Sequence, residues 1–396
     1  MTPSRALRAA AVLVAVTVGL IACAPARATA PGSSDGAGVI GVALPTTADA
    51  VWSRGADALS RELTARGYRV DLQFAASDAR TQAAQVRNML TKSVDAVIVA
   101  PLASGDLSTS VAAADETGVP VIAFGRSLEG FGVAGAIAFD PAALGRAQAQ
   151  ALLADLADAP TVEEVSPSPT PSPTTSDATG LVPIEEPGTA RVAVLSASES
   201  DAWESARYEA AMAALQSAIE AGRIEIVSGA TRDAALVDGD TAEGQAGAAE
   251  KRVRALREGA LDEVPTAVLA LGDAVTRGVV TALTTDPPEA DGETASPTPS
   301  PAATDGGADA GPALAPLVVG SGADPLTVRA LRDGDLDAAV FADPRALVSA
   351  TADAVEAVLD DRDVPVEAAD EVSPSILRAD DVEELIASGW ISADEL

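Results

Sequence analysis

Histidine is absent from this chain of 396 residues, and cysteine occurs once. Without histidine, the nucleophilic systems that pair serine or cysteine with an imidazole base are excluded. Zinc sites built from histidine and cysteine are excluded as well. A single cysteine forms no internal disulfide, so the fold must depend on its hydrophobic core alone.

Aromatic residues and basic charge are also scarce. Aromatics make up 3% of the chain against 47% hydrophobic residues, which predicts a core of Ala, Val and Leu. The length suggests about two domains. The 26 basic residues stand against 59 acidic ones, giving a net charge of −33. This balance excludes a nucleic-acid-binding surface and argues against docking on an anionic membrane.

The N-terminus has the pattern of a secretory signal. Arg5 and Arg8 precede an apolar run, 9–20, that is shorter than the roughly 20 residues needed to span a bilayer. The run ends in Leu20-Ile-Ala-Cys23, which resembles the lipobox of bacterial lipoproteins. Signal cleavage after Ala30, releasing a soluble protein, is the alternative.

Cys23 favours the lipoprotein interpretation because the one cysteine stands where lipidation requires it. We therefore expect residues 1–22 to be a signal peptide. Residues 23–37 then form a tether that holds the protein, through its lipid, on the outer face of the cell membrane.

The rest of the chain alternates short apolar runs with longer segments of helical spacing, and the series restarts after Phe124. Runs that are apolar throughout predict parallel strands covered on both faces, so we expect two doubly wound α/β lobes with the ligand at the carboxyl ends of the strands. The expected strands are 39–44, 70–74, 96–100, 119–124, 137–139, 192–195, 224–227, 267–271, 317–319 and 338–341. The expected helices are 49–66, 80–92, 105–117, 142–157, 202–221, 241–258, 274–283, 325–333 and 345–359.

Two stretches rich in Pro, Ser and Thr, 160–187 and 286–312, interrupt the second series. Such composition does not pack a core. Each stretch follows an expected helix and precedes an expected strand, which places it at the sheet edge opposite the ligand. We expect surface insertions with no part in binding, and whether they are O-glycosylated stays open.

Several motifs together carry a family resemblance. They include Ile40-Gly-Val-Ala-Leu-Pro, Val94-Asp-Ala-Val-Ile-Val, Val318-Val-Gly-Ser-Gly-Ala-Asp and the final Gly389-Trp-Ile-Ser-Ala-Asp-Glu-Leu. The chain resembles type 1 periplasmic binding proteins, in the xylose and multiple-monosaccharide branch that serves ABC importers. The resemblance implies two Rossmann-like lobes that close by a hinge on a ligand in the cleft between them, with three chain crossings. It places lobe 1 at 38–125 and 343–363, and lobe 2 at 126–342 and 364–396.

The ligand positions that the resemblance implies carry altered residues. Trp52 follows Val51 instead of an arginine, and an aspartate gives way to Gly125 before Arg126. Another aspartate becomes Gly322, and a hinge lysine becomes Ala342. Sugars are held by charged side chains and an aromatic ring, so these losses predict weak binding of plain monosaccharides. The remaining ligand-binding candidates are Trp52, Arg126, Glu199, Asp201, Asp273 and Ser321.

Each candidate has a second interpretation. Trp52 stacks on a ligand or packs between the lobes, and Arg126 binds a ligand or forms an ion pair between the lobes. The acids Glu199, Asp201 and Asp273 accept hydrogen bonds from a ligand or lie at helix N-termini, where the macrodipole and capping favour acids.

No catalytic site or cofactor is expected. The first apolar run is followed by Pro45-Thr-Thr47, which is not a glycine-rich phosphate loop. We therefore predict a monomeric, lipid-anchored substrate-binding protein of an ABC importer, with a sugar or another small polar solute as ligand and the importer's permease as partner. The alternative is a sensor or envelope lipoprotein that keeps the fold but has lost the sugar site.

Overall fold

The computed structural model describes residues 38–102, 104–128, 132–158, 188–197, 202–239, 241–258, 264–285, 315–364 and 372–396. The expected signal peptide, Cys23, the tether and both Pro-rich stretches lie outside the described residues, as do Glu199 and Asp201. Within these ranges, no helix combines the length and the apolar character needed to cross a membrane.

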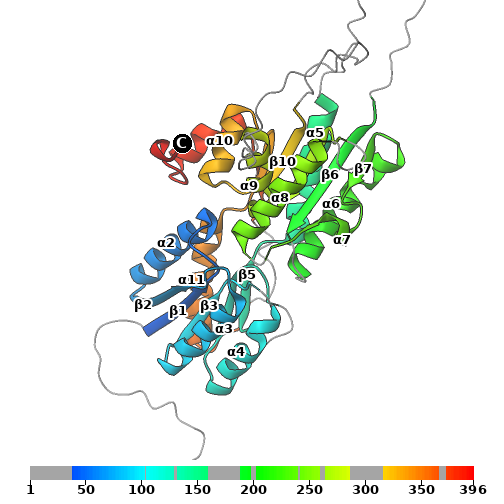
Figure 1. Cartoon of the computed structure of the whole chain (residues 1–396). Helices are drawn as coiled ribbons and strands as arrows, with labels where there is room; N and C mark the ends of the chain where they lie inside the picture. The colour runs from blue at the N-terminus through cyan, green and yellow to red at the C-terminus, as the bar shows by residue number, and fades with distance from the viewer. Residues whose placement is uncertain are drawn as a thin grey trace, which may run out of the picture. The chain divides into compact units, whose positions relative to one another are not determined.

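The first sheet is parallel throughout, in the order β2-β1-β3-β4-β5 (Figure 1). Its strands are β1 (Gly38–Leu44), β2 (Tyr68–Phe74), β3 (Ala96–Val99), β4 (Val121–Gly125) and β5 (Gly135–Ala138). Side chains alternate between its two faces, as the strand pleat requires. Ile40, Val42 and Leu44 pack with helices α2 (Ala50–Ala65) and α11 (Val348–Leu359). The next residues along, such as Ala43, pack with α3 (Ala79–Thr91) and α4 (Ser104–Thr117).

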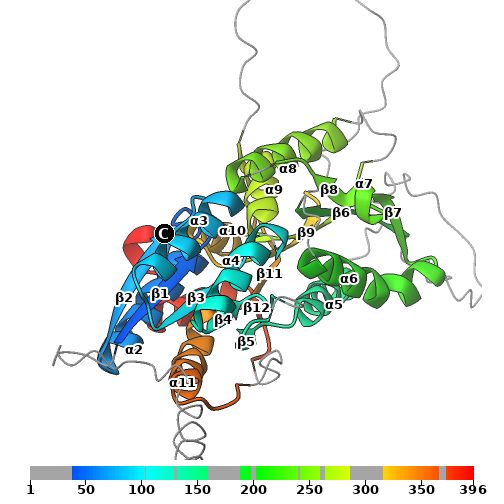
Figure 2. The ribbon, with the colours of Figure 1, turned by 90° about the horizontal axis from the view of Figure 1, so that it is seen from below.

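The second sheet has the order β12-β11-β10-β9-β6-β7, with the short β8 paired to β6. Its strands are β6 (Ala190–Ala197), β7 (Ile224–Ser228), β8 (Leu236–Val237), β9 (Ala267–Leu271), β10 (Leu317–Ser321), β11 (Ala338–Phe341) and β12 (Ser375–Leu377). Helices α5 (Pro141–Asp158) and α6 (Ala202–Glu220) lie side by side on one face (Figure 2). Helices α8 (Ala242–Arg257), α9 (Asp273–Thr284) and α10 (Pro325–Asp333) cover the other.

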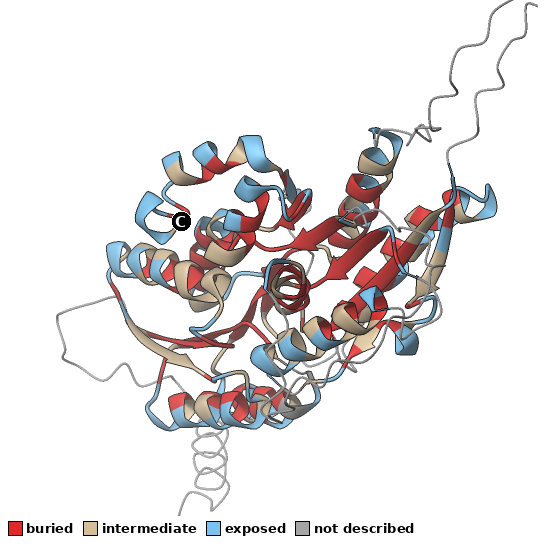
Figure 3. Cartoon of the chain, turned by 45° about the horizontal axis from the view of Figure 1, so that its top comes forward, coloured by how far each residue is buried: buried red, intermediate tan, exposed pale blue. Residues whose placement is uncertain are grey.

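The inner strands of both sheets are buried between these helical layers, whereas the edge strands β2, β7 and β12 are partly exposed (Figure 3). The expected fold class, two doubly wound α/β lobes, is therefore confirmed. Smaller elements complete the described chain: α7 (Arg232–Ala235), α12 (Val382–Ala387) and the 3-10 turns Pro344–Leu347, Ala379–Asp381 and Ala393–Glu395.

One expectation about the strands is wrong, and one strand was not expected. We expected the strand at 137–139 to open the second lobe, but β5 pairs in register with β4, with Ile122 opposite Gly135, and so belongs to the first sheet. An apolar run does not reveal which sheet it joins. The short strand β12, which was not among the expected strands, pairs antiparallel with β11 at an edge of the second sheet.

The chain passes between the two sheets three times within the part that the structure describes. It leaves the first sheet after β5, because α5 packs on the second. It returns after β11 to place α11 on the first sheet, and crosses again before β12. The lobes are thus built from discontinuous stretches of the chain, which the crossing segments join.

Candidate functional site

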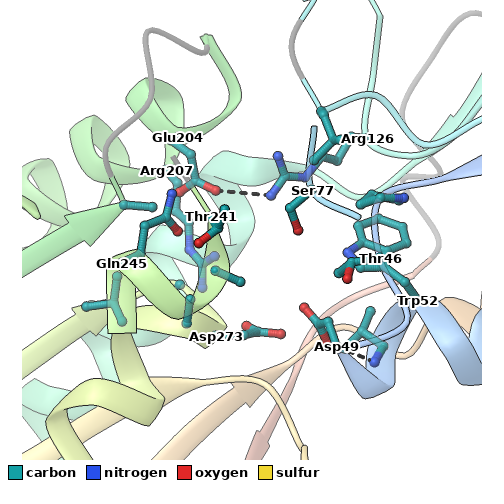
Figure 4. A pocket seen from close by; sticks show the side chains of 18 residues that line it. Thr46, Asp49, Trp52, Ser77, Arg126, Glu204, Arg207, Thr241, Gln245 and Asp273 are labelled. Carbon is teal, nitrogen blue, oxygen red and sulfur yellow. Dashed lines mark hydrogen bonds and ion pairs between the residues drawn. The ribbon is translucent and has the colours of Figure 1, made fainter. Parts of the chain in front are cut away.

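A cleft opens where the carboxyl ends of the two sheets meet. Its larger part has a volume of about 160 Å³ and its smaller part about 80 Å³. Both parts share the side chains of Val51, Trp52, Arg126, Arg207 and Asp273, so they form one site (Figure 4). The position agrees with the sheet edge at which doubly wound folds bind ligands.

Trp52 occupies the first turns of α2 and lines both parts of the cleft. Its ring lies directly against Gly125, where an added Cβ would stand 3.2 Å from ring carbons Cη2 and Cζ3. Gly125 also has φ +74°, a conformation that favours glycine. Gly125 is thus a position whose missing side chain makes room for the indole. Trp52 also packs against the core of the first lobe, so it meets the packing interpretation while forming a wall of the cleft.

Asp49 enters the site as the N-cap of α2, a position that favours aspartate because its carboxylate satisfies a free backbone N–H. The carboxylate accepts from the backbone N–H of Val51 at 3.0 Å. Burial, followed by the negative charge of Asp273, raises the pKa of Asp49 to about 7, against the lowering effects of the Val51 N–H and Arg277. Asp49 was not among the predicted site residues, although its place before an apolar helix is a capping signal.

Asp273 faces Asp49 from the other lobe (Figure 4). We expected either a ligand acceptor or an acid at a helix N-terminus, and Asp273 does lie in the first turn of α9, although it is not the N-cap itself. The N-cap of α9 is Gly272, and Asp273 is the first helical residue. Its Oδ1 accepts from the hydroxyl of Ser321 at 2.6 Å. A Cβ at Gly322 would lie 2.7 Å from the Asp273 carboxyl carbon, so this glycine also makes room for a side chain of the cleft.

Ser321 ends β10 and, as a predicted site residue, lines the smaller part of the cleft while remaining 4% exposed. Its hydroxyl donates to Asp273 and accepts from Nη2 of Arg207 at 2.8 Å. Ser321 therefore connects the carboxylate of one helix with the guanidinium of another, and its main contact is to Asp273 itself.

Arg207 is a site residue that the sequence did not reveal. It lies in α6, is 5% exposed, and its Nε donates to Oε1 of Gln148 at 2.8 Å. Burial lowers the pKa of Arg207, and the negative charges of Glu204 and Asp273 act in the opposite direction. The available signal was that α6 contains a single basic residue in an Ala-rich helix.

Arg126 follows β4 and crosses the cleft to Glu204 in the first turn of α6, with 3.3 Å between Nη2 and Oε1. Its guanidinium also lies 5.7 Å from the ring centroid of Trp203. Of the two roles expected for Arg126, the ion pair between lobes is present, and the side chain still lines the cleft. Glu204 is 4% exposed, and its Oε2 has no hydrogen-bond partner among the described residues.

The walls of the cleft thus offer carboxylates, guanidinium groups, hydroxyls and an indole ring within one small volume. Such a set suits a small polar ligand that both donates and accepts hydrogen bonds. No group of three or more acidic or sulfur-bearing side chains placed to hold a metal ion occurs in the described ranges.

Two α/β lobes with a polar cleft between their strand ends define a two-lobed ligand-binding protein. The chain belongs to the periplasmic binding protein family, because residues 40–363 match the family model for the periplasmic binding protein domain. This match confirms the family resemblance seen in the sequence.

Sequence relatives include the multiple sugar-binding periplasmic receptor ChvE of Rhizobium radiobacter, 34% identical over 26% of this chain and 29% of the receptor. The D-xylose-binding periplasmic protein of Escherichia coli is 29% identical over 29% of this chain and 34% of that protein. The chain therefore aligns with about a third of the length of these relatives.

The structure is similar to that of an ABC transporter solute-binding protein from Clostridium phytofermentans with bound β-D-glucose. The TM-score is 0.68 at 22% identity, covering 90% of this chain and 99% of the other. A solute-binding protein from Mycobacterium smegmatis with bound glycerol has a TM-score of 0.63 at 18% identity, covering 89% and 97%. At these identities the likeness concerns the fold.

Proposed function

We propose that this protein is an extracytoplasmic substrate-binding protein that captures a sugar or another small polyhydroxylated solute for an ABC importer. The observation that carries the proposal is the cleft itself, which is lined by acids and arginines from both lobes and by the Trp52 ring. Its relatives bind several sugars and xylose, and its structural neighbours hold glucose and glycerol.

The charged groups of the cleft support a ligand with hydroxyl groups. A hydroxyl both donates to a carboxylate such as Asp273 and accepts from a guanidinium such as Arg126. A ligand with hydroxyl groups can therefore form hydrogen bonds with both the acids and the arginines of the cleft. The indole of Trp52 offers an apolar face against which the carbon side of a sugar ring packs. These contacts replace those expected at positions 125 and 322, where Trp52 and Asp273 fill the space.

Thermal-shift screening of monosaccharides, polyols, nucleosides and amino acids at millimolar concentration tests this function, with calorimetry for each hit. A ligand at a hundred times its Kd stabilises the fold by about 2.7 kcal/mol. Trp52→Ala, checked for native circular dichroism, should lose the shift. A panel in which no compound of any class binds contradicts the binding function and favours the sensor or envelope lipoprotein. A hit of another chemical class keeps the importer and changes its cargo.

The proposal includes export and a lipid anchor at Cys23, for which the lipobox-like Leu20-Ile-Ala-Cys23 is the support. Fractionation of cells that express the wild type and Cys23→Ala tests the anchor. The wild type should sediment with membranes and the variant should not. If both are soluble and begin after Ala30, ordinary signal cleavage is the correct interpretation.

A further inference from the structure

The charged side chains of the cleft are unequally compensated. Arg126 is paired with Glu204 across the lobes, and Arg207 reaches Asp273 through the hydroxyl of Ser321. Within the described part of the chain, the Asp49 carboxylate accepts a hydrogen bond only from the backbone N–H of Val51. Three acids and two arginines of the described residues line the larger part of the cleft, which leaves one negative charge over.

Asp49 and Asp273 approach one another from opposite lobes (Figure 4). The other charged groups that act on Asp49 are Arg277 of α9 and Asp324, the N-cap of α10. Those two form an ion pair with 3.5 Å between Nη1 and Oδ2, so Arg277 is already matched by an acid. Burial, and after it the negative charge of Asp273, raises the pKa of Asp49 to about 7.

We propose that the ligand carries a protonated amine on a polyhydroxylated frame, and that the amine binds between Asp49 and Asp273. This inference rests on the proposed function and narrows its ligand to an amino sugar or amino polyol. An ammonium group brings three donors and the positive charge that the pair lacks. It also removes the repulsion that opposes closure of the two lobes over an empty cleft.

Two further observations agree with a cationic ligand. Glu204 Oε2 is a buried carboxylate oxygen in the cleft wall that has no hydrogen-bond partner in the described part of the chain, and so adds to the acceptors. The whole protein has a net charge of −33, which raises the local concentration of cations at its surface and clefts.

Binding of an amine should release one proton from the protein to the buffer. Below pH 7 the Asp49 carboxyl is largely protonated, and an ammonium ligand displaces that proton to the buffer as the carboxylate ion pair forms. A neutral sugar leaves the proton in place. Proton release therefore distinguishes an amine bound at Asp49 from a sugar bound elsewhere in the cleft.

Calorimetry with D-glucosamine, D-galactosamine, D-mannosamine and 1-amino-1-deoxy-D-sorbitol, each beside its parent sugar or polyol and its N-acetyl derivative, tests the inference. At least one amine should bind about tenfold or more tighter than both its neutral counterparts. Runs at pH 6 in buffers of different ionisation enthalpy should show proton release on binding of that amine and none with the parent compound.

Asp49→Asn is the variant that isolates the charge, because asparagine remains a good N-cap and its carbonyl still accepts from Val51 N–H. It should abolish the preference for the amine over its parent compound, because the charge that favours the amine is gone. Asp78→Asn is the matched control, since Asp78 caps the neighbouring helix α3 in the same way and does not line the cleft. That control should keep the preference.

The outcomes separate the two proposals. A parent sugar or polyol that binds as tightly as every amine overturns the inference and leaves the binding function standing. Preference for an amine that survives Asp49→Asn overturns the assigned place of the amine. If no amine, sugar or polyol binds at all, the proposed function fails and the inference fails with it.

Discussion

The two lobes use the same device to hold the ends of their strands, and they differ in what completes it. In the first lobe the buried Gln82 of α3 donates to the carbonyl of Ala100 at 2.7 Å, and its Oε1 accepts the backbone N–H of Leu102 at 3.0 Å. In the second lobe the buried Gln148 of α5 donates to the carbonyls of Ala270 and Gly320, at 2.9 and 3.1 Å.

The difference lies in the donor that satisfies the glutamine oxygen. In the first lobe it is backbone, and the network ends there. In the second it is the Arg207 side chain, which continues to Ser321 and Asp273. The side-chain network of the second lobe therefore fixes Asp273 in place. Asp49 of the first lobe is held by one backbone N–H, and its pKa is raised by burial and by the negative charge of Asp273. The same scaffold thus holds one acid through a network of side chains and the other through a single backbone N–H.

Gln148→Leu and Gln82→Leu test this difference between the lobes through the free energy of unfolding. Each leaves buried carbonyls without donors, and Gln148→Leu also leaves Arg207 Nε unpaired. We expect losses in the free energy of unfolding of about 3 kcal/mol for Gln148→Leu and about 2 kcal/mol for Gln82→Leu. Urea titration measures both. Only the lobe 2 variant should also weaken ligand binding, and equal effects on binding would contradict a special role for the second network.

Substitution of the cleft glycines has a middle-sized effect. Gly125→Ala, Gly322→Ala and Gly118→Ala each place a side chain at φ between +69° and +88°, which costs about 1 kcal/mol in stability. A Cβ added at Gly118 would meet no atom within 4 Å, so this position serves as the matched control. The two cleft variants should lose binding by displacing Trp52 or Asp273. If both cleft variants bind the ligand as the wild type does, ligand binding does not depend on the exact positions of Trp52 and Asp273.

The pH dependence of stability tests the charge of Asp49 directly. The pKa of Asp49 in the folded protein, about 7, lies above its ordinary value of 3.8. The stabilising contribution of the protonated form is complete below pH 3.8 and is lost as pH rises toward 7. The difference in unfolding free energy between wild type and Asp49→Asn should therefore change across this window, in favour of the variant at high pH. A difference that does not depend on pH would place Asp49 among ordinary surface acids.

Periodicity predicted most of the fold, because buried parallel strands and covering helices leave long apolar patterns such as Val94–Val99. It did not assign β5 to its sheet, since pairing is decided by tertiary contacts that a run of Gly, Ala and Ile does not specify. The short antiparallel β12, with two exposed residues, has no apolar pattern to find.

The site was predicted in part. Trp52, Arg126, Asp273 and Ser321 do line the cleft, whereas Glu199 and Asp201 lie outside the described residues. Arg207 could not be found because its role depends on burial against Gln148, a partner 59 residues away. The cleft glycines looked like lost ligand contacts, and only the three-dimensional packing reveals that neighbouring side chains fill their space.

The position of α11 has a consequence for how the chain is made. The first sheet is complete at Ala138, yet the helix that shares its inner face with α2 begins only at Val348. Roughly 210 residues separate these points, an interval of roughly 10–40 s at ordinary rates of synthesis. During that time Ile122, Phe124 and their neighbours have no helix α11 to cover them. The first lobe to be synthesised is thus among the last parts of the chain that can finish folding.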